Sequence, residues 1–154
     1  MPSATPSPHE PTVTSADGAD DPAAERAAAD AAATDLVALT ALVADWTTVP
    51  DIAERMDVPL VRVRQMIADR EVISLRTGPR RVVSIPAKFI GAEGPLPELK
   101  GTFTVLGDGG MNDLEIVRWL FTPDDSLPVV GAPIDALLAG HKAEIRRRAQ
   151  ALAF

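Results

Sequence analysis

Arginine is concentrated in one short part of this acidic chain. The 154 residues carry a formal net charge of -7, yet residues 62–81 hold six arginines against only Asp69 and Glu71, a local charge of +4. A guanidinium group presents paired N–H donors that match phosphate geometry, and clustered basic side chains bind nucleic-acid backbones by displacing counterions. Phosphate binding is therefore the chemistry that this stretch could perform.

Residue types needed for catalysis or metal binding are sparse. The chain has no cysteine, which excludes disulfides and thiolate metal sites, and its two histidines, His9 and His141, lie far apart in sequence. Asp124 and Asp125 are paired carboxylates, but they fall in the turn-like sequence TPDDSLP, where Asp caps and turns the backbone. We expect no catalytic site, no bound metal and no cofactor.

The sequence also predicts a compartment. The absence of cysteine suits a reducing cytoplasm. No apolar stretch approaches the roughly 18 residues that a membrane-spanning helix needs, and the N-terminus lacks the basic segment and apolar run of a secretory signal. We expect a cytoplasmic protein with no membrane partner.

The segment that leads into the arginine-rich stretch has the pattern of two short helices joined by a tight turn. Thr48 and Pro50 are typical of a helix start, which predicts a helix at about 49–56. Pro59 disfavours helical geometry at the residue before it and begins another helix, at about 60–70. Two such helices form a helix-turn-helix, in which the second is the recognition helix.

Polar side chains occupy the outer face of this second helix. At 100° per residue, Arg62 and Gln65 point outward and Arg64 flanks them, while apolar residues line the inner side. In the major groove of DNA, Arg62 or Arg64 could bond the edge of a guanine, and Gln65 could bond the edge of an adenine.

A β-hairpin is predicted directly after the recognition helix. Residues 72–76 and 81–85 are rich in β-branched side chains, and the turn sequence TGPR separates them. A helix-turn-helix followed by a hairpin is a winged helix. Its two-stranded wing, at 76–81, would place on the phosphates of double-stranded DNA the side chains of Arg76, Arg80 and Arg81.

These runs resemble a known family. The sequence TVPDIAERMDVPLVRVRQMIADREVI, followed by RTGPRRVVSIPAKFI, is similar to the winged helix-turn-helix of MerR-like and excisionase-like DNA-binding proteins. Together with WLFTPDDSLP and PIDALLAGHKAEIRRRAQALAF, the chain from Leu36 to Phe154 resembles a small actinobacterial family of DNA-binding regulators with a winged helix and a helical C-terminal domain.

The resemblance implies a transcriptional regulator. It assigns the recognition role to Arg62, Arg64 and Gln65 and the wing role to Arg76, Arg80 and Arg81. The chain departs from many such motifs at Asp57 and Pro59, where Gly and a capping Ser or Thr are common. Asp tolerates the left-handed backbone that the turn requires.

The first 33 residues differ in composition from the rest. They are rich in Pro, Ala, Ser, Thr and Asp and contain few large apolar side chains, so they cannot bury enough surface to offset the entropy of ordering. We therefore predict a disordered acidic tail at 1–33, in which the alanine run at 23–33 could form a frayed helix at most, a winged-helix domain at 34–92 and a helical C-terminal domain at 93–154, in a mainly α protein. The first core helix is expected from Leu36 to Trp46, on an apolar stripe.

The acidic tail contains three candidate phosphorylation sites, Thr5, Thr12 and Thr14. Phosphate on one of them would add a charge of about -1.5 to -2 and compete with DNA for the arginines. A Ser/Thr protein kinase is the partner that this hypothesis requires. A passive solubilising tail is the alternative.

The last third of the chain reads as helical. Asn112 with Glu115 marks a helix start, and further helices are expected at 133–140 and 143–152. The run from Arg146 to Arg148 could contact a second stretch of DNA backbone, or it could simply complement the helix dipole.

An alternative function follows from the same region. The segments WLFTPDDSLP and PIDALLAG are also similar to the partner-binding domains of some antitoxins. In that case the chain would be a protein-interaction module whose C-terminal domain binds a partner protein.

Overall fold

The computed structural model describes residue 4 and residues 21–153. Thr5, Thr12 and Thr14 lie outside this described part. The first half contains three helices and a three-stranded sheet: α1 (Pro22–Val43), β1 (Trp46–Thr48), α2 (Val49–Met56), α3 (Leu60–Ala68), β2 (Leu75–Thr77) and β3 (Val82–Pro86). The second half contains a 3-10 turn η1 (Ala87–Phe89), the strands β4 (Ile90–Gly91) and β5 (Gly94–Pro95), and the helices α4 (Pro97–Asp108), α5 (Asp113–Phe121), α6 (Pro133–Leu138) and α7 (Lys142–Leu152).

The predicted helix-turn-helix is confirmed. The Thr48 hydroxyl accepts the N–H of Asp51 at 3.3 Å and caps α2, and Pro50 occupies the first turn. Asp57 ends α2 in the left-handed conformation, with φ 54° and ψ 51°. Pro59 then starts α3, which ends at Ala68, two residues before the predicted end.

The predicted wing is also present, and its strands are shifted. β2 pairs antiparallel with β3, Leu75 lying opposite Ser84 and Thr77 opposite Val82. The turn spans 78–81, and Gly78 has a φ of 73° that few other residues adopt without strain. Residues 72 and 73, expected in the strand, are instead buried in the core ahead of it.

A third strand, β1, pairs with the other edge of β3 and was not predicted. The prediction that the first core helix reaches Trp46 is wrong, because Ala44 turns the chain out of α1 with φ 64°. Trp46 keeps its position beside α1 by donating its indole N–H to the Thr40 carbonyl at 3.1 Å. The apolar spacing therefore predicted correctly that Trp46 packs against the core, but it predicted the wrong backbone conformation for this residue.

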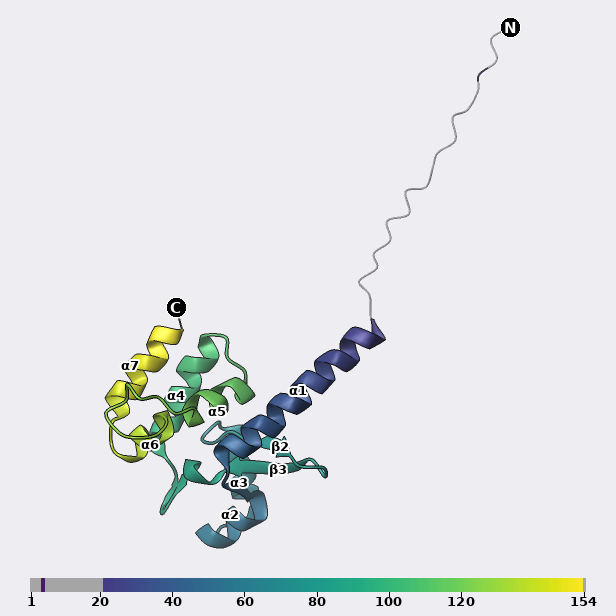
Figure 1. The fold of residues 1–154 in the computed structure, drawn as a ribbon. Coiled ribbons are helices and arrows are strands. Elements are labelled where there is room, and N and C mark those ends of the chain that lie inside the picture. The colour runs from purple at the N-terminus through teal and green to yellow at the C-terminus, as the bar shows by residue number, and fades with distance from the viewer. Residues whose placement is uncertain (1–3, 5–20, 154) are drawn as a thin grey trace.

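Helix α1 begins much earlier than expected. The Asp21 carboxylate accepts the N–H of Ala23 at 3.0 Å and caps the helix, which then runs through the alanine-rich segment. The predicted disorder of residues 22–33 is wrong, since alanine has the highest helix propensity. Figure 1 shows this half of α1 projecting from the body, and its residues are exposed.

One hydrophobic core runs through the winged-helix part, residues 34–92, and the C-terminal part, residues 93–153. The ring of Phe89, in η1, lies 5.5 Å from that of Phe103 in α4 and 5.7 Å from that of Phe121 in α5. Ion pairs also join the two parts, from Arg70 to Asp113 at 2.9 Å and from Lys88 to Asp135 at 2.7 Å. The C-terminal helices therefore hold a fixed position beside the winged helix.

The C-terminal helices follow their sequence signals closely. Asn112 and Glu115 form a reciprocal capping box at the start of α5, with hydrogen bonds of 2.8 and 2.9 Å. Helix α7 lies beside α4 and buries Ile145 and Ala149 (Figure 1). Leu152, which would continue this stripe, is half exposed because it lies in the last turn of α7. No helix in the described part of the chain is long and apolar enough to cross a membrane.

Candidate nucleic-acid interface

Helix α3 buries one side and exposes the other. Val63 and Met66 are buried against the core, whereas Val61 is 68% exposed. Arg62 and Arg64 are both exposed and lie on opposite flanks of this surface. The two arginines therefore project from opposite sides of α3, Arg64 toward β3 and Arg62 toward α4.

Two of the three predicted recognition residues have acidic neighbours. The Gln65 side-chain amide donates to Asp69 Oδ1 at 2.9 Å, one helical turn on. Arg62 Nη2 lies 3.7 Å from Glu71 Oε2, a buried oxygen without a hydrogen-bond partner in the structure. A ligand that binds Arg62 or Gln65 must therefore compete with a carboxylate of the same surface.

Arg64 has a different setting. It borders an apolar hollow of about 480 Å³ between α3 and strand β3, whose walls include Ile67, Val82 and Val83. No hydrogen bond or ion pair links Arg64 to another side chain within the described residues. Its guanidinium is thus the recognition-helix cation most available to an anionic ligand.

The wing carries its three arginines at and beside its turn. Arg76 Nη1 donates to the carbonyl of Arg81 at 3.4 Å, which ties the two strands together. Arg81 has the left-handed φ of 51°, and Arg80 is exposed at the turn. Arg76 and Arg81 border a groove of about 910 Å³ between the wing and α1, on a different side from Arg64.

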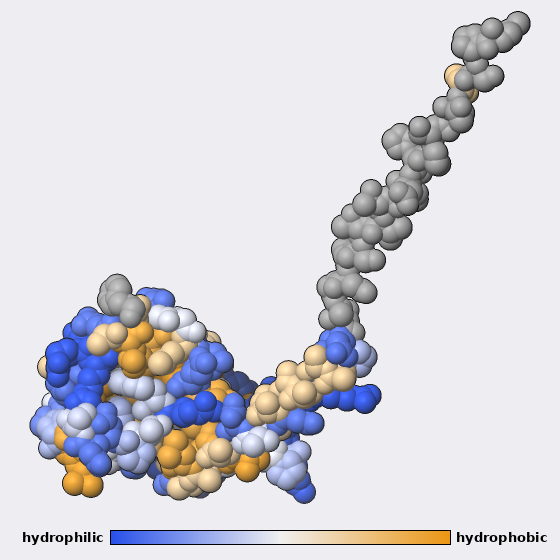
Figure 2. Space-filling model, turned by 45° about the horizontal axis from the view of Figure 1, so that its top comes forward, coloured by the Kyte–Doolittle hydropathy of each residue, from blue (hydrophilic) through white to orange (hydrophobic). Residues whose placement is uncertain are grey.

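Apolar residues dominate the rest of that groove. Its α1 wall includes Ala29, Ala33 and Val37, and Val37 is 71% exposed. Figure 2 shows a band of mildly hydrophobic surface along the projecting half of α1, flanked by hydrophilic side chains. The six predicted DNA-binding residues therefore occupy three neighbouring settings: the two flanks of α3 and the wing.

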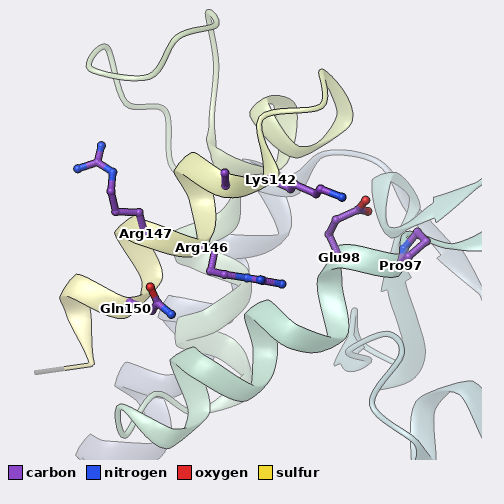
Figure 3. Close-up of a pocket in the computed structure, with 7 residues that line it drawn as sticks. Pro97, Glu98, Lys142, Arg146, Arg147 and Gln150 are labelled. Carbon is purple, nitrogen blue, oxygen red and sulfur yellow. The ribbon is translucent and has the colours of Figure 1, made fainter.

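The three consecutive arginines of α7 do not act together. Arg148 donates to Glu144 at 2.7 Å, to Asp124 at 3.0 Å and twice to Ser126 at 2.8 Å, and its side chain is only 23% exposed. Arg147 pairs with Glu144 at 2.7 Å. Arg146 points toward α4, away from this network (Figure 3). The run lies in the middle of α7, so the predicted helix-terminus explanation is wrong.

Hydrogen bonding shifts the pKa values within this network. Bonds from the Ser126 hydroxyl and backbone N–H, aided by Arg148, lower the pKa of Asp124 below its usual range. Bonds from Arg147 and Arg148 lower the pKa of Glu144, and Glu144 in turn raises the pKa of Arg147. The network holds the 122–132 connection against α7, which is a structural role.

Sequence reasoning missed Lys142, which lies one turn before Arg146 on the same side of α7. The spacing of four residues was a signal that could have found this basic pair. Among the described residues, no group of three or more His, Asp or Glu side chains is placed to hold a metal ion.

Comparison with known proteins covers both parts of the chain. Residues 34–90 match the family model described as "DNA-binding protein Rv2175c, wHTH domain", and residues 96–153 match that described as "Rv2175c C-terminal domain of unknown function". The DNA-binding protein Rv2175c of Mycobacterium tuberculosis is 38% identical over 116 residues, which cover 68% of this chain and 78% of that protein. A solved NMR structure of Rv2175c matches with a TM-score of 0.65 and 36% identity, over 71% of this chain and 82% of that one.

Proposed function

The chain belongs to the Rv2175c family of winged-helix proteins, and from this membership we propose that it binds double-stranded DNA as a transcriptional regulator. The observation that carries the proposal is the position of Arg64. Its guanidinium, which has no ion-pair or hydrogen-bond partner within the described residues, projects from the recognition helix of a winged-helix fold, and the wing beside it bears Arg80 at its turn. An arginine in this position can bond a guanine edge in the major groove while wing arginines bind phosphate oxygens.

Acidic neighbours set how the recognition helix approaches DNA. Asp69 and Glu71 lie at the end of α3, where they hold Gln65 and Arg62. Both carboxylates repel phosphate, so we expect the backbone to pass by the wing and by Arg64 and to avoid the C-terminal end of α3. Gln65 must release Asp69 before it can bond an adenine.

DNA binding can be measured by fluorescence anisotropy of the full-length chain with a pooled library of genomic duplex fragments. We expect saturable binding that selects some fragments and weakens as salt rises. An absence of binding even at low salt would contradict the proposal.

The separate roles of helix and wing can be tested with two variants. Arg81→Ala should weaken binding to all sequences about equally and reduce the salt dependence by about one phosphate contact. Gln65→Ala should change the sequence preference instead. If the two variants behave alike, the assignment of reading to α3 and of phosphate binding to the wing is wrong.

We also propose that the N-terminal tail regulates binding. Thr5, Thr12 and Thr14 lie in an acidic segment, and phosphate on one of them would add about -1.5 to -2 charge that competes with DNA for the arginines. Quantitative phosphorylation by a Ser/Thr protein kinase should then weaken DNA binding. Unchanged binding after phosphorylation would remove this regulatory role.

A further inference from the structure

The C-terminal part presents a second basic surface that the proposed recognition helix and wing do not use. Lys142, Arg146 and Gln150 recur every four residues along α7 and face the beginning of α4. Together with Pro97 and Glu98 they line an open hollow of about 410 Å³. In Figure 3 the side chains of Lys142 and Arg146 extend toward α4, whereas Arg147 points away.

The cations of this hollow differ from the neighbouring arginines of the same helix. Arg147 and Arg148 are held by Glu144 and Asp124, as described above. Lys142 and Arg146 form no ion pair or hydrogen bond with any side chain that the structure describes, and both are exposed. Arg147 borders the hollow as well, but its guanidinium is held by Glu144.

The hollow connects with the recognition helix. A second hollow, of about 270 Å³, is lined by Lys100 of α4 and by Arg62 of α3 with its ion-pair partner Glu71, and Pro97 borders both hollows. Exposed basic side chains therefore follow one another from α3, across the start of α4, to α7. We call the part of this surface that lies on α4 and α7 the α7 track, defined by Lys100, Lys142 and Arg146.

The α7 track lies on the opposite side of α3 from the wing. Arg64 faces strand β3, whereas Arg62 faces α4. Figure 1 shows the wing tip and α7 on opposite sides of the molecule, with α3 between them. The wing and the track therefore flank α3 on two sides, and the Arg62–Glu71 pair lies between α3 and the track.

The spacing of the cations suits a nucleic-acid strand. Lys142 and Arg146 are four residues apart, which is about 6 Å along the helix axis. Successive phosphates of one DNA strand advance by about 3.4 Å along the duplex, so the pair can meet phosphates one or two steps apart. Lys142 and Arg146, which are exposed and form no ion pair among the described residues, are available to such a repeating anion.

We infer that the α7 track binds the phosphate backbone of the same DNA duplex that the recognition helix reads, so that the C-terminal part extends the DNA footprint beyond α3. The inference rests on the proposed DNA-binding function. It assigns the C-terminal domain a sequence-independent phosphate contact and leaves base reading to α3.

Glu98 provides a second test, in which removing a charge should strengthen DNA binding instead of weakening it. Its carboxylate borders the hollow, is half-buried, and is the one acidic side chain among the residues that line it. A phosphate placed between Lys142 and Arg146 must approach this carboxylate. Glu98→Gln should therefore tighten DNA binding several-fold, while Lys142→Gln and Arg146→Gln weaken it.

The experiment measures the affinity of the full-length chain for a duplex of selected sequence by fluorescence anisotropy, across a salt series. The double variant Lys142→Gln/Arg146→Gln should bind about tenfold more weakly at low salt, and its slope of log K against log salt should fall by about 1.8, or about 0.9 for each lost phosphate contact. Sequence preference should stay the same, because no base contact is removed.

Arg118→Gln and Arg26→Gln serve as matched controls. Arg118 lies on α5 and faces Asp35 at 3.6 Å, and Arg26 lies on the exposed half of α1, so each variant removes one positive charge outside the track. The control double variant should leave the salt slope unchanged. Thermal melting of all variants confirms that each is folded at the assay temperature.

The outcomes separate this inference from the proposed function. If the wild-type chain binds DNA and the track variant matches the control variant in affinity and slope, the inference is overturned and DNA binding stands. Weaker binding by Glu98→Gln would also overturn it. If the wild-type chain fails to bind any duplex at low salt, the proposed function fails, and the track inference falls with it.

Discussion

Two groups of arginines in this molecule have opposite settings. Arg64 and Arg80, on the recognition helix and the wing, are exposed and have no side-chain partner among the described residues. Arg147 and Arg148 of α7 are held by Glu144, and Arg148 also by Asp124 and Ser126. The first group is available to an external anion, whereas the second has its anions within the chain.

The difference shows that acidic partners within the chain, and not the density of arginines, decide whether a basic cluster is available to an external anion. Glu144 lies three and four residues before Arg147 and Arg148, so their pairing follows from helix geometry alone. Asp69 and Glu71 neighbour the first group but hold Gln65 and Arg62 instead of Arg64. The comparison predicts that variants of the two groups will separate stability from DNA binding.

The largest expected effect tests whether both groups lie on one folding unit. Phe89→Ala removes the ring that packs against Phe103 and Phe121 and leaves a cavity between the two parts. The free energy of unfolding should fall by about 3–5 kcal/mol in a single transition, measured by urea denaturation. Val130→Ala, at a fully exposed position, is the control and should change it by less than about 0.5 kcal/mol.

Two separate unfolding transitions, or a loss below about 1 kcal/mol for Phe89→Ala, would break the comparison. The two groups of arginines would then belong to two independently folded domains, and not to two surfaces around one core.

The next effect concerns Arg148. Arg148→Met removes hydrogen bonds to Glu144, Asp124 and Ser126 and should lower the free energy of unfolding by about 2 kcal/mol, because the side chain is mostly buried. DNA affinity below the melting temperature should stay at the wild-type value. Arg147→Met, at a 73% exposed side chain, should leave the free energy of unfolding nearly unchanged, because solvent screens the ion pair with Glu144. Equal losses for the two variants would show that the Arg148 network has no special role.

Arg80→Gln should give the reverse result. The side chain lies at the exposed wing turn, so its loss should weaken DNA binding about tenfold, or about 1.4 kcal/mol, and leave the melting temperature unchanged. Arg118→Gln removes the same charge from α5, away from the wing, and serves as the control. If both variants weaken binding equally, the wing contributes only to the overall charge of the protein.

The smallest effect is a dependence of stability on pH. The pKa values of Asp124 and Glu144 are lowered in the folded protein, so their contribution is present above the unfolded values, at about 4, and is lost as pH falls through the lower folded values. Between pH 6 and pH 2 the wild-type chain should therefore lose more stability than Arg148→Met does. Parallel urea midpoints for the two proteins across this range would contradict the network.

Local signals in the sequence predicted most of the elements that carry these residues. Thr48, Pro50 and Pro59 specify the helix-turn-helix through caps and fixed φ angles, and Asn112 with Glu115 specifies the start of α5. Each of these signals acts over a few residues. Such signals are readable without tertiary information.

The helical start of α1 was missed although its signal, the alanine run, is local, whereas the other errors arose where tertiary contacts decide the structure. Strand β1 forms because β3 is available beside it, and Trp46 belongs to that strand although its spacing fits a helix. The partners of Arg148 include Asp124, which lies far from it in sequence. The six candidate residues are divided among three surfaces because of where α1 and α4 pack. Hydrophobic periodicity does not predict these packing positions.

The central claim is that this chain binds duplex DNA through α3 and the wing. The most direct test is to map backbone amide chemical-shift changes by NMR in the full-length chain as a selected duplex is added. We predict that the largest changes fall in residues 60–69 and 76–82, with smaller ones near Lys142 and Arg146. No change at all, or changes confined to α1 and α5, would contradict the account.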